Sequence, residues 1–216
     1  MLSAYKAVVF DFDFTLADSS RALCQCVNYA LNDLGFAPAT EKQIKRLSGF
    51  PLQKIFSTLS GVENSEQEQS FIRSFTVEAD VVMTSHTSLF SGVPEVLNGL
   101  QSAGKKTAIV STKYRYRIED VLTLHSLSKS VDLIIGGEDV TAYKPDPQGI
   151  HLVLKSFGLT PEDILYVGDS FVDAETARNA NVDFIAVTSG ATFGHEFESY
   201  EPLAVMSSIE TLLQYL

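Results

Sequence analysis

Two pairs of closely spaced aspartates follow two short apolar segments of this chain. Asp11 and Asp13 come directly after the apolar, β-branched run 4–10. Along a strand, side chains at i and i+2 face the same side, so these two carboxylates are expected to project together. Asp169 and Asp173 follow a second apolar run and are four residues apart. Crowded carboxylates repel one another unless a cation or a shared proton is present. The four residues are therefore candidates for a site that binds Mg²⁺, which prefers oxygen ligands.

Each pair also has a simpler interpretation. Asp11 and Asp13 resemble two solvated acids at the end of a strand. Asp169 or Ser170 is suited to cap a helix that begins at Phe171, because short polar side chains are preferred at that position. Capping and metal binding are compatible with each other.

Two hydroxyl residues and a lysine elsewhere in the chain are candidates for binding a phosphate. Ser111 and Thr112 end the apolar run 107–110, where hydroxyls and backbone N–H groups can hold phosphate oxygens. Lys144 precedes Pro145, which pushes its backbone toward an extended form. A lysine held in this way offers a fixed positive charge to a carboxylate or a phosphate.

The elements that must position these residues alternate between strand and helix patterns. Short β-branched runs predict strands at 4–10, 106–111, 132–136, 164–168 and 183–188. Segments with helical spacing lie between them, at 94–103, 117–125, 147–157, 171–180 and 208–216. This alternation predicts an α/β fold, a Rossmann-like, doubly wound parallel sheet with helices on both faces. Ligands of such sheets bind at the carboxyl ends of the strands, where the aspartate pairs are expected.

Residues 19–88 break this rhythm. They contain no convincing strand and predict helices at 20–34, 40–47, 51–59 and 65–83, separated by glycine and proline. We expect an all-helical insertion at 18–88, with the α/β core formed by 1–17 and 89–216.

Composition and charge restrict the partners. The net charge is −11 and basic residues form no stripe, so a nucleic-acid partner is not expected. No apolar run approaches the ~20 residues of a membrane span. No signal peptide is recognised, so we expect a cytoplasmic protein. We expect a monomer or a homodimer. Cys24 and Cys26 lie on different sides of a predicted helix and are expected to stay reduced.

Taken together, the four motifs resemble those of the haloacid dehalogenase superfamily of phosphohydrolases. The segments 11–16, Ser111, Lys144 and 168–173 occur in the order and with the spacing of that family. The helical insertion resembles its cap, inserted after the first strand, and the segment 46–52 resembles the cap of the phosphoglycolate phosphatase-like branch. The resemblance covers nearly the whole chain.

The resemblance implies a mechanism for phosphate-ester hydrolysis. Asp11 is expected to be the nucleophile that forms an aspartyl-phosphate, and Asp13 the general acid and base. Mg²⁺ is expected to be held by Asp11, the backbone carbonyl of Asp13 and Asp169, with support from Asp173. The substrate is expected to be a small phosphorylated metabolite.

The resemblance also implies which residues bind the substrate. Ser111 and Lys144 are expected to contact the phosphoryl group and to support catalysis. Thr15 and Thr112 are further expected contacts, and Arg46 of the cap is a candidate for an anionic part of the substrate. Two positions depart from the family pattern: Phe14 stands where Gly is common, and Thr112 where Asn is common.

Other activities on this fold are not excluded by the sequence. A phosphomutase of the β-phosphoglucomutase type shares Asp11, Asp13 and Lys144 and differs mainly in excluding water. A catalytically silent, phosphate-binding regulator is a second alternative. Phosphonate hydrolysis would use a cap lysine, but none of the cap lysines stands in a recognised motif. The presence of Asp13 argues against dehalogenation.

Overall fold

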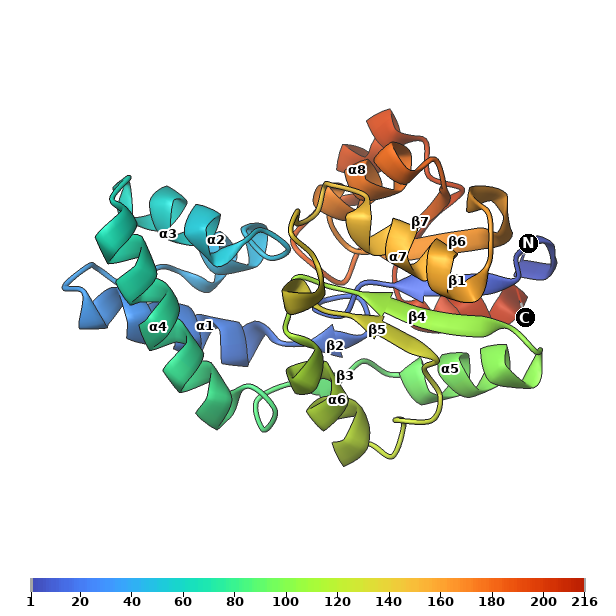
Figure 1. Ribbon diagram of the computed structural model, residues 1–216, viewed down its shortest axis with the longest axis horizontal. Helices are drawn as coiled ribbons and strands as arrows, with labels where there is room; N and C mark the ends of the chain where they lie inside the picture. The colour runs from blue at the N-terminus through green and yellow to red at the C-terminus, as the bar shows by residue number, and fades with distance from the viewer. Residues whose placement is uncertain (1, 216) are drawn as a thin grey trace.

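A six-stranded parallel sheet forms the centre of the larger part of the molecule (Figure 1). The computed structural model describes residues 2–215. The strand order is β5-β4-β1-β6-β7-β8. Their bounds are β1 Ala7–Phe10, β4 Lys106–Val110, β5 Leu133–Ile135, β6 Ile164–Gly168, β7 Asp183–Val187 and β8 Ala204–Met206. The predicted α/β fold with a parallel sheet is confirmed.

Helices cover both faces of the sheet. One face packs against α5 (Val93–Ser102), α6 (Arg115–Leu124) and the 3₁₀ segment Ile209–Tyr215. The other face packs against α7 (Gln148–Phe157), α8 (Phe171–Ala180) and the 3₁₀ segment Gly194–Tyr200. Shorter 3₁₀ turns lie at Leu2–Ala4, Gly137–Asp139 and Pro161–Asp163.

The central strand β1 is apolar throughout because both of its faces are buried. Val8 and Phe10 belong to the core on one face, and Ala7 and Val9 to the core on the other. All four residues are fully buried. Because successive side chains of a strand point to opposite faces, a strand covered on both sides has no polar position.

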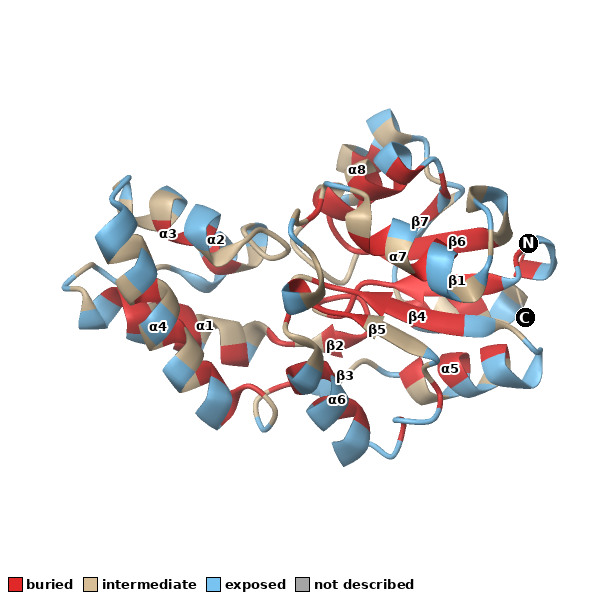
Figure 2. Ribbon diagram, viewed as in Figure 1, coloured by how far each residue is buried: buried red, intermediate tan, exposed pale blue. Residues whose placement is uncertain are grey.

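Four helices are inserted after the first strand and have a core of their own. They are α1 (Ser20–Asp33), α2 (Glu41–Arg46), α3 (Leu52–Ser60) and α4 (Ser65–Val82). Their buried side chains include Phe56, Phe71 and Phe75, whose rings contact one another in sequence. Figure 2 shows these buried segments facing inward between the helices, with exposed residues outside. The predicted helical insertion is confirmed, and we refer to it as the cap.

A two-stranded antiparallel ribbon joins the cap to the sheet. It pairs β2 (Ala17–Asp18), which leads into α1, with β3 (Ser88–Leu89), which follows α4. The sequence reasoning did not predict this ribbon or β8. Both are short, and a segment of two or three residues carries no alternation by which a strand can be recognised.

Some predicted boundaries were wrong by a few residues. The first strand begins at Ala7 rather than Ala4, since residues 2–4 form a 3₁₀ turn. The helix predicted at 208–216 is a 3₁₀ segment at Ile209–Tyr215, and Leu216 lies outside the described residues. Among residues 2–215, no helix combines the length and hydropathy needed to cross a membrane.

Candidate active site

The predicted site residues converge because three adjacent strands end at the same edge of the sheet. Phe10, the last residue of β1, is in register with Ile109 of β4 on one side and Val167 of β6 on the other. Asp11 therefore emerges between Ser111, which follows β4, and Asp169, which follows β6. Parallel strands place their carboxyl ends at one edge, so the topology accounts for the meeting of three sequence-distant motifs.

Lys144 lies between two of the aspartates. Its Nζ is 3.0 Å from Asp11 Oδ1 and 2.7 Å from Asp173 Oδ1. All three side chains are buried. Burial disfavours the charged lysine, but the two carboxylates outweigh it, so the pKa of Lys144 is raised. The lysine predicted to stand beside the nucleophile is therefore charged and close to it.

Asp11 is the least satisfied carboxylate of the group. Its Oδ1 is fully buried and accepts no aligned hydrogen bond from the described residues, although Lys144 is within ion-pair distance. Burial raises the pKa of Asp11 to about 7, with Lys144 opposing this effect and Asp173 adding to it. A buried charge needs compensation. Among the described residues, Lys144 is thus the cation that compensates this buried oxygen.

Asp173, by contrast, is held by four hydrogen bonds. The backbone N–H and the hydroxyl of Ser170 donate to Oδ2, as in a capping box at the start of α8. Lys144 and the Tyr166 hydroxyl donate to Oδ1, at 2.7 and 2.8 Å. With both oxygens occupied, Asp173 is suited to orient Lys144. Ser170, one of the two residues predicted to cap this helix, is its N-cap, and Asp173 also belongs to the acidic cluster.

Tyr166 was not predicted as part of the site. It lies within β6, is fully buried, and its hydroxyl also lies 3.3 Å from Lys144 Nζ. Burial and the nearby Asp173 raise the pKa of Tyr166 well above its usual value, so the phenol stays protonated. In the sequence it looks like an ordinary core aromatic residue. Its proximity to Lys144 could not be seen without the fold.

Asp169 is positioned from two sides. The Thr15 hydroxyl donates to its Oδ1 at 3.2 Å. On the other side, a Cβ added at Gly190 would lie only 1.8 Å from its Oδ2, so no larger residue fits there. Burial, followed by the charges of Asp173 and Asp11, raises the pKa of Asp169 well above its usual value.

The carboxylates fit a divalent metal. Asp11, Asp169 and Asp173 each place one oxygen within 4.8 Å of the others, and all three are buried. Burial, with a smaller contribution from the neighbouring carboxylates, raises the pKa values of Asp11 and Asp169, so a cation would favour the charged forms of both. An all-oxygen donor set, with one Asp11 oxygen lacking an aligned donor, suits Mg²⁺. Asp13 was predicted to bind the metal through its backbone carbonyl. Its carboxylate is not part of this cluster.

Asp13 instead faces the cap. Its Oδ1 accepts from Lys113 Nζ at 2.7 Å and from the Ser19 hydroxyl. Its Oδ2 has no hydrogen-bond donor among residues 2–215, and the residue lines a cavity described below. Lys113 was not predicted as a partner, although it directly follows the Ser111–Thr112 motif. Lys113 Nζ also lies 5.7 Å from the centre of the Phe12 ring.

The remaining predicted residues are at or near this edge. Ser111 is buried at the end of β4, and its Oγ accepts from the Lys113 backbone N–H at 3.3 Å. Thr112 lines the cavity. Thr15 is buried and bonded to Asp169, as described.

Arg46 lies outside the cavity. Its guanidinium donates to the carbonyl of Ala191 and forms an ion pair with Glu196, so it links cap to core. Substrate contact by Arg46 stays a prediction, and it would require this ion pair to open.

Phe14 has an unusual backbone. Its φ is 63°, in the left-handed region where a bulky side chain is strained and glycine is not. Its ring is buried, with Lys45 Nζ 5.7 Å from the ring centre. The departure from the family pattern thus falls at a turn whose conformation favours the usual glycine.

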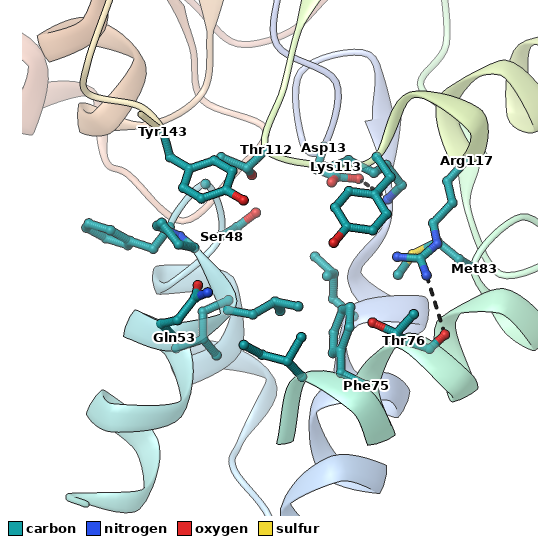
Figure 3. Close-up of a pocket in the computed structure, with 18 residues that line it drawn as sticks. Asp13, Ser48, Gln53, Phe75, Thr76, Met83, Thr112, Lys113, Arg117 and Tyr143 are labelled. Carbon is teal, nitrogen blue, oxygen red and sulfur yellow. Dashed lines mark hydrogen bonds and ion pairs between the residues drawn. The ribbon is translucent and has the colours of Figure 1, made fainter. Parts of the chain in front are cut away.

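A cavity of about 100 Å³ lies between this edge of the sheet and the cap (Figure 3). Asp13, Thr112 and Lys113 lie on its core side, with Tyr143 beside them. Helices α3 and α4 close it on the other side. The cavity therefore begins at the carboxylate predicted to serve as the general acid.

Comparisons with known proteins agree with this arrangement. Residues 8–187 match the model of the family described as haloacid dehalogenase-like hydrolase. A phosphoglycolate phosphatase 1 of Pseudomonas aeruginosa is 30% identical over 96% of this chain and 78% of its own length. A phosphoglycolate phosphatase of Colwellia psychrerythraea is 28% identical over 98% of this chain and 97% of its own.

A solved structure is more similar still. A haloacid dehalogenase-like hydrolase from Bacteroides fragilis superposes with a TM-score of 0.94 and is 42% identical, covering 96% of this chain and 99% of its own. The predicted resemblance to the phosphoglycolate phosphatase-like branch, with its helical cap, is confirmed by these relatives. The match over most of the chain, together with the fold, shows that this protein belongs to the haloacid dehalogenase-like hydrolases.

Proposed function

We propose that this protein is a Mg²⁺-dependent phosphatase of small phosphomonoesters, in which Asp11 receives the phosphoryl group. The observation that carries the proposal is the placement of Asp11. Its carboxylate is buried, lies 3.0 Å from Lys144, and belongs to a cluster with Asp169 and Asp173. The relatives named as phosphoglycolate phosphatases support a phosphomonoester substrate.

In the first step, an Asp11 oxygen attacks phosphorus while the bond to the leaving alcohol breaks. Asp13 gives its proton to the leaving oxygen, which departs as the neutral alcohol. Asp13 is suited to this role because its Oδ2 has no donor within the described chain and the residue lines the cavity. Lys144 offsets the negative charges of Asp11 and of the incoming phosphate.

In the second step, Asp13 takes a proton from water, whose oxygen attacks the phosphorus of the aspartyl-phosphate. The bond between phosphorus and Asp11 breaks, which releases inorganic phosphate and restores the carboxylate. Ser111 and Thr112, at the end of β4, are proposed to hold the phosphoryl oxygens.

Asp11 and Asp169 are proposed to hold Mg²⁺, with the backbone carbonyl of Asp13 as a further ligand. When bound, the metal supplies positive charge that offsets repulsion between the carboxylate and the phosphate. Asp173 is proposed to act through its hydrogen bonds, because both of its oxygens are already occupied. We further propose that 1–17 with 89–216 form the catalytic core, and 18–88 the cap that covers the leaving group.

Release of inorganic phosphate from a panel of phosphomonoesters, 2-phosphoglycolate included, tests the proposal. We expect turnover with Mg²⁺, none in excess EDTA, and recovery when Mg²⁺ is restored. The same assay distinguishes hydrolysis from phosphomutase activity, because a mutase would isomerise a sugar phosphate without releasing inorganic phosphate.

A matched pair of variants tests the nucleophile. Asp11→Asn is expected to lower kcat by more than about 10³-fold, because the amide cannot carry the phosphoryl group. Asp120→Asn makes the same chemical change at an exposed position of α6 and should leave kcat unaltered. Activity near wild type in Asp11→Asn, or full activity in excess EDTA, would refute the proposal.

A further inference from the structure

The cavity beside Asp13 is apolar on its cap side. Ile72 and Phe75, one helical turn apart on α4, line it together with Leu52 and Ile55, which have the same spacing on α3. Side chains three residues apart share a helix face, so both helices present an apolar face to the cavity. Leu23, Phe50, Pro51 and Met83 complete this wall.

The cations of the cavity wall both lie on its core side and have acidic neighbours. Among the lining residues these are Lys113 and Arg117. Lys113 Nζ is 2.7 Å from the Asp13 carboxylate. Arg117 lies 2.6 Å from Asp80 and also donates to the Thr76 carbonyl at 3.4 Å, a bond drawn in Figure 3.

On the cap side, none of the described lining residues carries a positive charge, so a negative group on the leaving alcohol would lack a counter-ion there. Burying a carboxylate without a paired cation is strongly unfavourable, since the charge loses its hydration. The remaining polar groups of the wall are uncharged and include the side chains of Tyr143, Ser48 and Gln53. They can accept or donate a hydrogen bond, but they do not neutralise an anion.

The size of the cavity also favours a small leaving group. Its volume of about 100 Å³ is comparable to the roughly 150 Å³ of an engineered apolar cavity that admits benzene in another protein. A compact alcohol of about four to six carbon atoms matches the size of this space, and a nucleoside is larger than it.

We infer that the substrate is the phosphomonoester of a compact, uncharged alcohol with an apolar body, rather than 2-phosphoglycolate. The inference rests on the proposed function, because it identifies the leaving group of the same reaction. The substrate inferred for this chain therefore differs from phosphoglycolate, the substrate in the names of its relatives.

A matched pair of substrates tests the inference. Isobutyl phosphate has as many non-hydrogen atoms as 2-phosphoglycolate, with an isopropyl group in place of the carboxylate, and in both the leaving oxygen is bonded to a CH₂ group. We expect kcat/KM for isobutyl phosphate to exceed that for 2-phosphoglycolate by at least about tenfold. Isopentyl phosphate should be at least as good as isobutyl phosphate, and glucose 6-phosphate worse.

Placing a cation in the wall should reverse this preference. Ile72 is half-buried, so Ile72→Lys can extend an ammonium into the cavity without a large loss of core packing. The ratio of kcat/KM for isobutyl phosphate to that for 2-phosphoglycolate should fall by at least about tenfold. Val77→Lys, on the exposed side of the same helix, is the control and should leave the ratio unaltered. Leu52→Lys repeats the test from α3, should Ile72→Lys fail to fold.

The outcomes distinguish the two proposals. A wild-type preference for 2-phosphoglycolate or for glucose 6-phosphate would overturn the inference and leave the proposed phosphatase function standing. An unaltered ratio in folded Ile72→Lys and Leu52→Lys would also overturn it. Failure to release phosphate from every ester in the presence of Mg²⁺ would overturn the proposed function itself.

Discussion

Replacing Tyr166 with Phe removes one buried hydroxyl from the contact between Lys144 and Asp173. That hydroxyl donates to Asp173 Oδ1 at 2.8 Å and lies 3.3 Å from Lys144 Nζ. The ring stays in the core of the sheet, so no large cavity is created. The substitution therefore isolates one charge-assisted hydrogen bond in a fully buried site.

The expected magnitude follows from what remains after the change. Hydrogen bonds to charged groups contribute about 1.5–3 kcal/mol to stability. Asp173 Oδ1 still accepts from Lys144, so no buried charge is left without a partner, and the loss should stay within that range. For a chain of this size, such a loss lowers Tm by roughly 3–12 °C.

Urea unfolding followed by circular dichroism measures this loss. Tyr29→Phe removes a hydroxyl from an exposed tyrosine of the cap and should leave the free energy of unfolding unaltered. We also expect Tyr166→Phe to lower kcat, because Asp173 loses one of the bonds that orient it toward Lys144. Equal stability of Tyr166→Phe and wild type would show that the hydroxyl does not support the buried ion pairs.

Two further predictions concern the loop that follows β7. Gly190→Ala should weaken Mg²⁺ binding by about 10–100-fold in titration calorimetry, because the added Cβ would displace Asp169. Gly194→Ala, where a Cβ meets only ordinary contacts, should bind Mg²⁺ like wild type; equal affinities in both variants would disprove this positioning role. The Arg46 guanidinium lowers the pKa of Glu196 to about 2, so the link between cap and core is complete above pH 4.5 and is lost as the pH falls through 2. Carboxyl NMR should find a higher pKa for Glu196 in Arg46→Gln, and an unshifted pKa would show that the ion pair does not form in solution.

The positions of the charged motifs could be predicted because they depend on strand order and chain direction. Asp11, Ser111 and Asp169 each end an apolar run, and parallel strands bring such ends together. The apolar pattern of β1 follows from burial on both faces. Strand-helix alternation therefore carried enough information to place these three residues at one edge.

The partners of these motifs could not be predicted in the same way. Tyr166 and Gly190 act through contacts with residues that are close only in the folded chain, and neither type of residue is unusual at its position. Lys113 directly follows Ser111 and Thr112, yet its ion pair with Asp13 depends on how β1 and β4 lie beside each other. Local patterns identify strands and caps, whereas these contacts depend on side-chain packing across elements.

The cap was predicted as helices but not as a chemical surface. Its helix boundaries follow from glycine, proline and capping residues such as Thr40 and Asn64, which are local signals. Which of its apolar residues form the internal core and which line the cavity is decided by the packing of α3 and α4 against the sheet edge. Ile72 and Phe71 are neighbours in sequence, but Phe71 is fully buried in the cap and Ile72 lines the cavity.

Trapping the phosphoryl group on Asp11 tests the central claim most directly. Enzyme mixed with Mg²⁺ and a substrate that it turns over is quenched rapidly and reduced with borohydride, which converts an acyl phosphate to homoserine. Peptide mass spectrometry should find homoserine at position 11, and only in samples that received substrate. Substrate turnover without modification at position 11, or with homoserine at Asp13 or Asp169 instead, would contradict the account.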